Sequence, residues 1–213
     1  MSFKNLFLRT FAIAALGAAS LFAPLGQAQA AGQQYVTLNP AQPSDTPDKI
    51  EILEFFAYSC PHCAAMQPMV EKWAKTLPSN VVLRQVPVAF NASMTDLQKL
   101  YYSLQALDRM DLNDEVFKAI HTEHKRIFEA KAIADWAVSK GIDRAKFEAV
   151  FNSFGINAKI KRANELTQSY QIEGTPSISV GGQYVVSPSM TNSYQGTIDV
   201  AQKLLDGLLK DKK

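Results

Sequence analysis

The segment Ile50-Glu51-Ile52-Leu53-Glu54-Phe55-Phe56, separated by three residues from Cys60-Pro61-His62-Cys63, decides the fold of this chain. The first segment is rich in β-branched and aromatic residues and has few polar positions, which predicts a central strand buried on both faces. Apolar residues recur at helical spacing after the second cysteine, and Pro61 suits the first turn of a helix. The sequence therefore predicts a strand, a tight turn and a helix that begins at a cysteine.

Cys60 and Cys63 are the only two cysteines of the 213-residue chain. The first turn of a helix has unpaired backbone N–H groups and the positive end of the helix dipole, so a thiol placed there is stabilised as the thiolate. A thiol three residues later lies one turn further along the same face, and it can attack a mixed disulfide formed at the first. We therefore predict that Cys60 is the exposed nucleophile and Cys63 the deeper, resolving thiol.

Two other roles for the cysteines are weighed against this one. A structural disulfide between them would close a very short loop and would stabilise the fold little. A zinc site would need further ligands; His121 and His124 are available, but their separation from Cys63 fits none of the usual zinc spacings. Both histidines lie in a charged stretch that is typical of a solvated helix end. We therefore expect a redox-active pair and no metal.

Residues 1–30 are predicted to be a cleavable signal peptide. Lys4 and Arg9 form a basic start, residues 11–25 form an apolar stretch that is short for a membrane span, and Ala28-Gln29-Ala30 matches a cleavage pattern. An uncleaved membrane anchor is the alternative. Export would place the protein in an oxidising compartment, where disulfides persist. Two cysteines are few for a scaffold held together by disulfides, which again favours a pair that reacts.

The charges of the chain argue against nucleic acid as a partner. The sequence carries 22 basic and 20 acidic side chains, and the excess of +2 belongs to the predicted signal peptide. The rest of the chain is balanced in charge and has no basic block, whereas domains that bind nucleic acid usually carry a basic patch. We therefore expect no nucleic acid to bind.

Further strand patterns occur on both sides of the central strand and its helix. They share alternating or continuous apolar residues bounded by turn formers, and they occupy residues 35–38, 81–86, 177–180 and 184–186. Gly181-Gly182 lies between the last two and predicts a hairpin with a two-residue turn.

Helical patterns dominate the middle of the chain. Residues 92–170 show apolar residues only at helical spacing, which predicts an insertion of four or five helices. Asn113-Asp114 is predicted to cap one of these helices. A last amphipathic helix follows at residues 198–208. The order of elements is that of an α/β fold with a helical insertion.

This order resembles a thioredoxin fold, with Cys60-Pro61-His62-Cys63 after the second strand and Gly174-Thr175-Pro176 before the hairpin. The helical insertion, the CPHC motif behind Glu54-Phe55-Phe56 and the signal peptide resemble, more narrowly, the DsbA family of periplasmic thiol:disulfide oxidoreductases. The resemblance covers essentially the whole chain after the signal peptide. It implies a thioredoxin-like domain at residues 31–91 and 171–213, with an inserted helical subdomain at 92–170.

The family implies an activity and its partners. A disulfide between Cys60 and Cys63 would be donated to unfolded exported proteins with free thiols, and a DsbB-like membrane partner would re-oxidise the pair and pass electrons to quinone. No cofactor besides this redox-active disulfide is implied, and the protein would be a periplasmic monomer. The alternatives are an isomerase or reductase, which the lack of a separate dimerisation domain disfavours, and a chaperone-like module, which the cysteines disfavour.

The resemblance also implies roles for residues near the cysteines. Pro61 and His62 would tune the redox couple, since an imidazole near Cys60 can stabilise the thiolate by charge or hydrogen bond. Glu54 would be a buried acid that exchanges a proton with the resolving thiol; a solvent-facing position at the strand end is the alternative. Some relatives carry another acid at the position of Gln67, so Glu54 is expected to be the only acid nearby.

Pro176 matches the family's cis-proline, with an ordinary trans proline as the alternative. The backbone of Thr175 would then lie beside the disulfide, where an unfolded substrate can pair as a short extended strand. Enterobacterial-type members of the family commonly have valine at this position, and isomerase-type relatives often have threonine. Thr175 therefore leaves the balance between oxidase and isomerase activity open.

Overall fold

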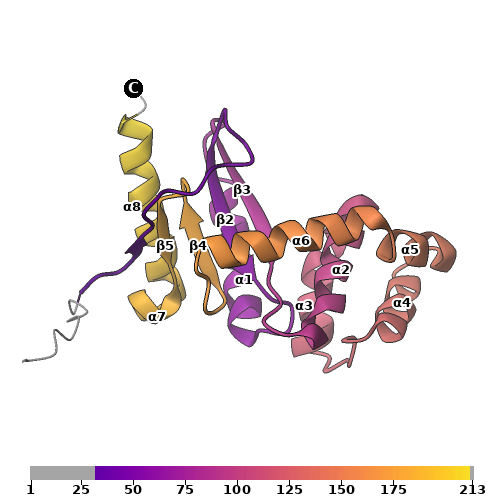
Figure 1. Ribbon diagram of the computed structural model, residues 1–213. Coiled ribbons are helices and arrows are strands. Elements are labelled where there is room, and N and C mark those ends of the chain that lie inside the picture. The colour runs from indigo at the N-terminus through magenta and orange to yellow at the C-terminus, as the bar shows by residue number, and fades with distance from the viewer. Residues whose placement is uncertain (1–31, 212–213) are drawn as a thin grey trace, which may run out of the picture. The chain divides into compact units, whose positions relative to one another are not determined.

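The structure, a computed structural model, describes residues 32–211 (Figure 1). The predicted signal peptide at residues 1–30 lies outside the described residues. Within residues 32–211, no helix has both the length and the apolar character needed to cross a membrane.

The centre of the fold is a mixed five-stranded sheet. Its strands follow one another in space in the order β1-β5-β4-β2-β3, with β2 hydrogen-bonded to β3 in parallel and to β4 in antiparallel fashion. The strand bounds are β1 Val36–Thr37, β2 Ile50–Phe56, β3 Val81–Pro87, β4 Ser177–Val180 and β5 Tyr184–Val186. All seven residues of β2 are buried, which confirms the prediction of a central strand.

Helices surround this sheet on both faces. The α-helices are α1 Pro61–Ala74, α2 Thr95–Ala106, α3 Asn113–His121, α4 Ala130–Ser139, α5 Arg144–Phe151, α6 Phe154–Ser169, α7 Pro188–Thr191 and α8 Tyr194–Asp211. Two short 3₁₀ helices lie at Ala92–Met94 and Met110–Leu112. The five helices α2 to α6 lie between β3 and β4, as the helical spacing predicts, whereas α7 is too short to have a recognisable pattern.

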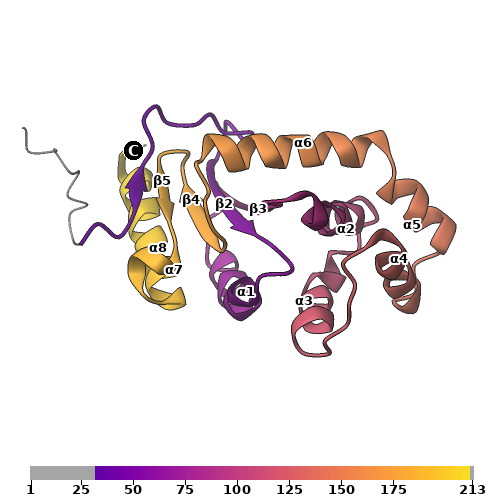
Figure 2. The same cartoon turned by 60° about the horizontal axis from the view of Figure 1, so that its bottom comes forward.

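The alternation of side chains along β2 divides the core in two. Ile50 and Ile52 point to one face, where they pack in a cluster with side chains of α1 and α8. Leu53 and Phe55 point to the other face and join the cluster of the helical insertion, where Phe55 contacts Tyr170 with ring centroids 5.4 Å apart. Figure 2 shows α6 above β2 and α1 below it, with α8 beside β5 at the other end of the sheet. The thioredoxin-like α/β fold with inserted helices is thus confirmed.

The hairpin loop differs from the prediction. Val180 pairs with Tyr184, so the loop has three residues, Gly181, Gly182 and Gln183, and not two. The backbone N–H of Leu38 donates to the carbonyl of Gln183 at 2.7 Å, which engages the third loop residue with the N-terminal segment. Both glycines have positive φ, at 61° and 69°, so the prediction of a glycine turn is confirmed. The predicted loop length of two residues is wrong by one residue.

The predicted cap at Asn113-Asp114 is wrong. Helix α3 begins at Asn113 itself, and its N-cap residue Leu112 makes no side-chain hydrogen bond to the helix. The side chain of Asn113 instead accepts a hydrogen bond from the hydroxyl of Tyr58 at 2.5 Å, in a buried position. A buried hydroxyl needs a hydrogen-bond partner, and the side chain of Asn113, which the local pattern assigns to capping, is the partner of the Tyr58 hydroxyl.

We predict opposite effects of alanine at two glycines. A Cβ at Gly182 would overlap the carbonyl oxygen of Gln42 and would sit on a backbone with φ of 69°, so Gly182→Ala should cost about 2 kcal/mol or more. A Cβ at Gly207 in α8 would meet no atom within 4 Å, so Gly207→Ala should stabilise by about 0.5–1 kcal/mol. Urea unfolding measures both. Equal midpoints for the two variants would contradict the loop geometry.

Candidate active site

Helix α1 places the two thiols in different surroundings. Cys60 is the N-cap residue, with φ of −87° and ψ of 117°, and its carbonyl accepts hydrogen bonds from the N–H groups of Cys63 and Ala64 at 3.1 and 3.2 Å. Cys60 is partly exposed, whereas Cys63 is 1% exposed and faces the core. Both are free thiols in the structure. The arrangement matches the predicted order of an outer and an inner thiol.

Hydrogen bonds favour the ionised form of Cys60. The pKa of this thiol is lowered to about 5, first by a hydrogen bond with the thiol of Cys63 and further by the side chain of Thr175 and the backbone N–H groups of Cys63 and His62. Burial opposes this shift but does not outweigh it. For Cys63, burial and the hydrogen bond to Cys60 raise the pKa far above the usual range of a thiol. At neutral pH the pair therefore holds one thiolate, on the outer sulfur.

The loop before β4 lies against Cys60. The peptide bond between Thr175 and Pro176 is cis, as the resemblance to the DsbA family implies, and the trans alternative is wrong. The carbonyl oxygen of Thr175 is 3.3 Å from Sγ of Cys60, so the thiol form of Cys60 donates to it. The hydroxyl of Ser177 donates to the carbonyl of Gly174 at 2.8 Å and closes this loop on itself. The backbone of Thr175 is thus placed beside the reactive sulfur.

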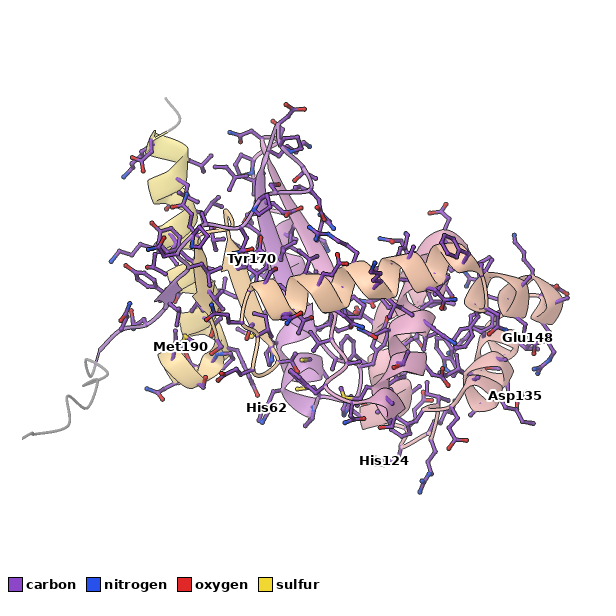
Figure 3. All side chains as sticks on the ribbon, in the orientation of Figure 1. His62, His124, Asp135, Glu148, Tyr170 and Met190 are labelled. Carbon is purple, nitrogen blue, oxygen red and sulfur yellow. The ribbon has the colours of Figure 1, made fainter. Side chains whose placement is uncertain are left out.

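The ring of His62 points to a partner that local sequence reasoning did not identify. Its Nδ1 is 2.8 Å from the hydroxyl of Tyr194, at the start of α8, 132 residues further along the chain. His62 lies near the lower end of α1 in Figure 3. What His62 contributes to the low pKa of Cys60 is its backbone N–H. The predicted hydrogen bond from the imidazole to Cys60 is replaced in this structure by the bond with Tyr194.

The histidines of the zinc alternative have other surroundings. His121 lies with Nε2 at 2.7 Å from the carbonyl of Tyr58 and stacks on Phe117, so it supports the segment that leads into Cys60. His124 is exposed (Figure 3). Within residues 32–211, no cluster of three or more metal-ligating side chains occurs.

Glu54 is buried, and the solvent-facing alternative is wrong. Only 1% of the residue is exposed, and burial raises the pKa of its carboxyl to about 7. Its position in β2 places it opposite Gln85 of β3, and Nε2 of Gln85 donates to Oε2 of Glu54 at 2.8 Å. Oε1 of Glu54 has no hydrogen-bond partner among the described residues. A buried carboxyl with this pKa can give or take a proton at neutral pH.

Glu54 is not the only acid in this region. The expectation that it would be, because Gln67 stands where some relatives carry an acid, is wrong. Nε2 of Gln85 also donates to Oε1 of Gln67 at 3.0 Å, and Nε2 of Gln67 donates to Glu71 at 3.1 Å and to Asp114 at 3.2 Å. Two further carboxyl groups are thus joined to Glu54 through two amide side chains. Glu71 lies four residues after Gln67 on α1, a spacing that could have been noticed, whereas Asp114 comes from α3.

These features define a class of protein. A thiolate-stabilising CPHC motif at a helix N-terminus, a resolving thiol one turn inside and a cis-proline loop against the outer sulfur, all on a thioredoxin-like fold, are the working parts of a thiol:disulfide oxidoreductase.

Comparison with known proteins identifies the family. Residues 51–195 match the DSBA-like thioredoxin domain family. The chain is 58% identical to the thiol:disulfide interchange protein DsbA of Bordetella pertussis over 200 residues, covering 93% of this chain and 95% of the relative. It is 34% identical to DsbA of Pseudomonas aeruginosa over 196 residues, with 91% and 93% coverage.

Solved structures agree. A crystal structure of Pseudomonas aeruginosa DsbA superposes with a TM-score of 0.80 at 32% identity, covering 84% of this chain and 95% of the other. This chain belongs to the DsbA family of thiol:disulfide oxidoreductases.

We predict that alkylation separates the two thiols. In the reduced protein, iodoacetamide should modify Cys60 with a rate that reaches half its maximum near pH 5, while Cys63 stays unmodified up to about pH 9. Thr175→Val removes the hydroxyl but keeps the shape, so the midpoint of its rate profile should lie at higher pH. Stopped-flow quenching with mass spectrometry measures both. A midpoint of 8 or above for the unchanged protein would contradict the low pKa of Cys60.

Proposed function

We propose that this protein is a periplasmic oxidase that donates a Cys60–Cys63 disulfide to the thiols of unfolded exported proteins. A DsbB-like membrane partner linked to quinone re-oxidises it. Residues 1–30 act as the signal peptide for export, and residues 92–170 form a helical subdomain inserted into the thioredoxin-like domain of residues 31–91 and 171–213. The observation that carries the proposal is the unequal stabilisation of the two thiols in the reduced pair.

The reaction takes two thiol–disulfide exchanges. A substrate thiolate attacks Sγ of Cys60, the Cys60–Cys63 bond breaks, and Cys63 leaves with the electron pair. A second substrate thiolate then attacks the first substrate sulfur, which forms the substrate disulfide and releases Cys60 as a thiolate. The substrate loses two electrons and the protein gains them. Cys63 takes up a proton on leaving, because its pKa is raised by burial.

The direction of disulfide transfer, from this protein to the substrate, follows from the stability of the reduced form of the Cys60–Cys63 pair. The pKa of Cys60 is about 5 in the folded protein and about 8.5 in an unfolded chain, so the folded dithiol form binds fewer protons between these values. The stabilisation that Cys60 gives to the reduced form is therefore complete above about pH 8.5 and is lost as the pH falls through about 5. A stabilised reduced form makes its disulfide a stronger oxidant at neutral pH.

Glu54 is the proton donor and acceptor for Cys63 in this proposal. A group with a pKa of about 7 can protonate the leaving thiolate and can accept the proton again when the pair is re-oxidised. Thr175 and Pro176 form the substrate-binding edge, since the backbone of Thr175 lies beside Cys60 and can pair with an extended chain. Pro61 and His62 tune the couple from between the cysteines.

The redox equilibrium with glutathione tests the oxidase proposal. In a series of glutathione buffers, the pair should become half reduced at ratios of reduced to oxidised glutathione that leave a thioredoxin-like couple oxidised. Tryptophan fluorescence or thiol counting follows the equilibrium. His62→Pro removes the backbone N–H that lowers the pKa of Cys60, so it should shift the midpoint towards a more reducing couple. A thioredoxin-like midpoint for the unchanged protein would refute the oxidase proposal and favour a reductase or isomerase. Full biological activity of Cys60→Ser would favour a chaperone-like module.

Removal of the buried acid should slow turnover. Glu54→Gln keeps the shape of the side chain but cannot exchange a proton, so the rate of oxidation of a dithiol peptide at pH 7 should fall at least tenfold. Glu148→Gln is the control, because Glu148 is an exposed acid on α5 (Figure 3). If both variants turn over equally fast, the proton-transfer role of Glu54 is wrong.

A further inference from the structure

A continuous row of hydrogen bonds leads from Glu54 to the protein surface. Nε2 of Gln85 donates to Glu54 at 2.8 Å and to Oε1 of Gln67 at 3.0 Å. Nε2 of Gln67 donates to Oε1 of Glu71 at 3.1 Å and to Oδ1 of Asp114 at 3.2 Å. Gln67 is 3% exposed, whereas Asp114 is exposed. The row therefore starts at a buried carboxyl and ends at two carboxyls near solvent.

The outer carboxyls determine which way both amides point. A carboxylate oxygen accepts hydrogen bonds, and Nε2 of Gln67 points outward and donates to Glu71 and Asp114. Its oxygen then points inward, where only a donor fits, and Gln85 supplies the donor with its own NH₂ group. The same NH₂ group reaches Glu54. The orientation of Gln67 is thus set by the two outer carboxyls, and the orientation of Gln85 is set by Gln67. As a result, Gln85 directs an N–H donor to the buried carboxyl of Glu54.

A cavity of about 400 Å³ lies beside this row. Gln67, Gln85 and Glu71 line it together with residues of α2 and α6, whereas Glu54 is 1% exposed and does not line it. Tyr101 of α2 also feels the charge of Glu54, although its pKa is raised mainly by burial. Arg84, next to Gln85 on β3, is bound by Asp45 and Glu51.

We propose that Glu71 and Asp114 are positioning residues for Glu54: by accepting from Gln67 they hold both amides in the orientation that keeps the NH₂ group of Gln85 on the buried carboxylate. When these acceptors are removed, both amides are free to turn over. The oxygen of Gln85 then faces Glu54, which can form a hydrogen bond to it only in the protonated form. The outer pair thus keeps Glu54 ready to ionise.

The proposal deepens the proposed function at one point, because Glu54 is the group that would handle the proton of Cys63. The coupling between the outer pair and Glu54 is separate from that role and can be measured without turnover. For removal of the outer carboxyls, simple charge repulsion predicts a lower pKa of Glu54, whereas reorientation of the two amides predicts a higher one. Glu71 is a negative neighbour that raises the pKa of Glu54, so loss of its charge alone would lower that pKa.

Two double variants separate these effects. Glu71→Gln with Asp114→Asn removes both charges but keeps an oxygen that can accept from Gln67. Glu71→Ala with Asp114→Ala removes the charges and the acceptors. The pKa of Glu54 is measured by ¹³C NMR titration of the side-chain carboxyl in the reduced protein, with Glu54→Gln to assign the signal. We expect the alanine pair to show a pKa about one pH unit above that of the amide pair.

Equal pKa values in the two double variants would overturn the proposal, since charge alone then accounts for the coupling. A third variant confirms the route: in a Gln67→Met background, the difference between the alanine pair and the amide pair should vanish. A difference that persists without Gln67 would also overturn the proposal. Should Gln67→Met not fold, the comparison of the two double variants still decides.

Turnover distinguishes this proposal from the role of Glu54. If the pKa of Glu54 moves as expected and the pH profile of dithiol oxidation moves with it, both stand. If the pKa moves and the pH profile stays unchanged, the positioning role stands and the proton-transfer role of Glu54 in the proposed function falls.

Discussion

The contact between Cys60 and the loop before β4 depends on the position of β2 in the sheet. Strand β2 is hydrogen-bonded to β3 on one side and to β4 on the other, and Phe55 near its end pairs with Ser177 at the start of β4. An antiparallel neighbour begins where its partner ends. The residues that follow β2 and those that precede β4 therefore meet at one edge, and this brings Thr175 to Cys60 although 115 residues separate them. The helical insertion lies between β3 and β4 in the chain, and the pairing of β2 with β4 is continuous beside it.

The two cysteine thiols are chemically identical, but their pKa values differ because α1 begins at the partly exposed Cys60 and continues into the core at Cys63. Cys60 caps α1 and gathers donors, whereas Cys63, one turn inside, has lost its hydration and faces apolar side chains. A similar asymmetry governs the carboxyls: Glu54 is held in an apolar strand, and the acids linked to it lie nearer to solvent. In the thiol pair, burial penalises the charge on the inner sulfur and leaves the charge on the outer one, and burial likewise penalises the charge on Glu54. The site is thus organised by a gradient of hydration.

The features that sequence patterns missed are contacts between distant segments. The ring of His62 is oriented by Tyr194, 132 residues away, and nothing in the CPHC motif indicates that partner. Asn113 looks like a helix cap, yet the buried hydroxyl of Tyr58 takes its side chain. The link from Gln67 to Asp114 joins helices that meet only in the folded chain. Each of these polar side chains can satisfy several partners, and the choice among them is made by what packing brings near.

The sequence by itself determined the buried central strand, the helix that begins at Cys60, the order of the two thiols, the helical insertion and the proline of the cis bond. The strand, the helix, the order of the thiols and the insertion follow from periodicity and from residue types within a few positions of one another, whereas the cis-proline was implied by the resemblance to the DsbA family. Only the tertiary structure decided which side chains meet the thiols and the buried acid. Those contacts depend on sheet register and helix packing, where a polar group takes whichever partner the fold leaves within reach.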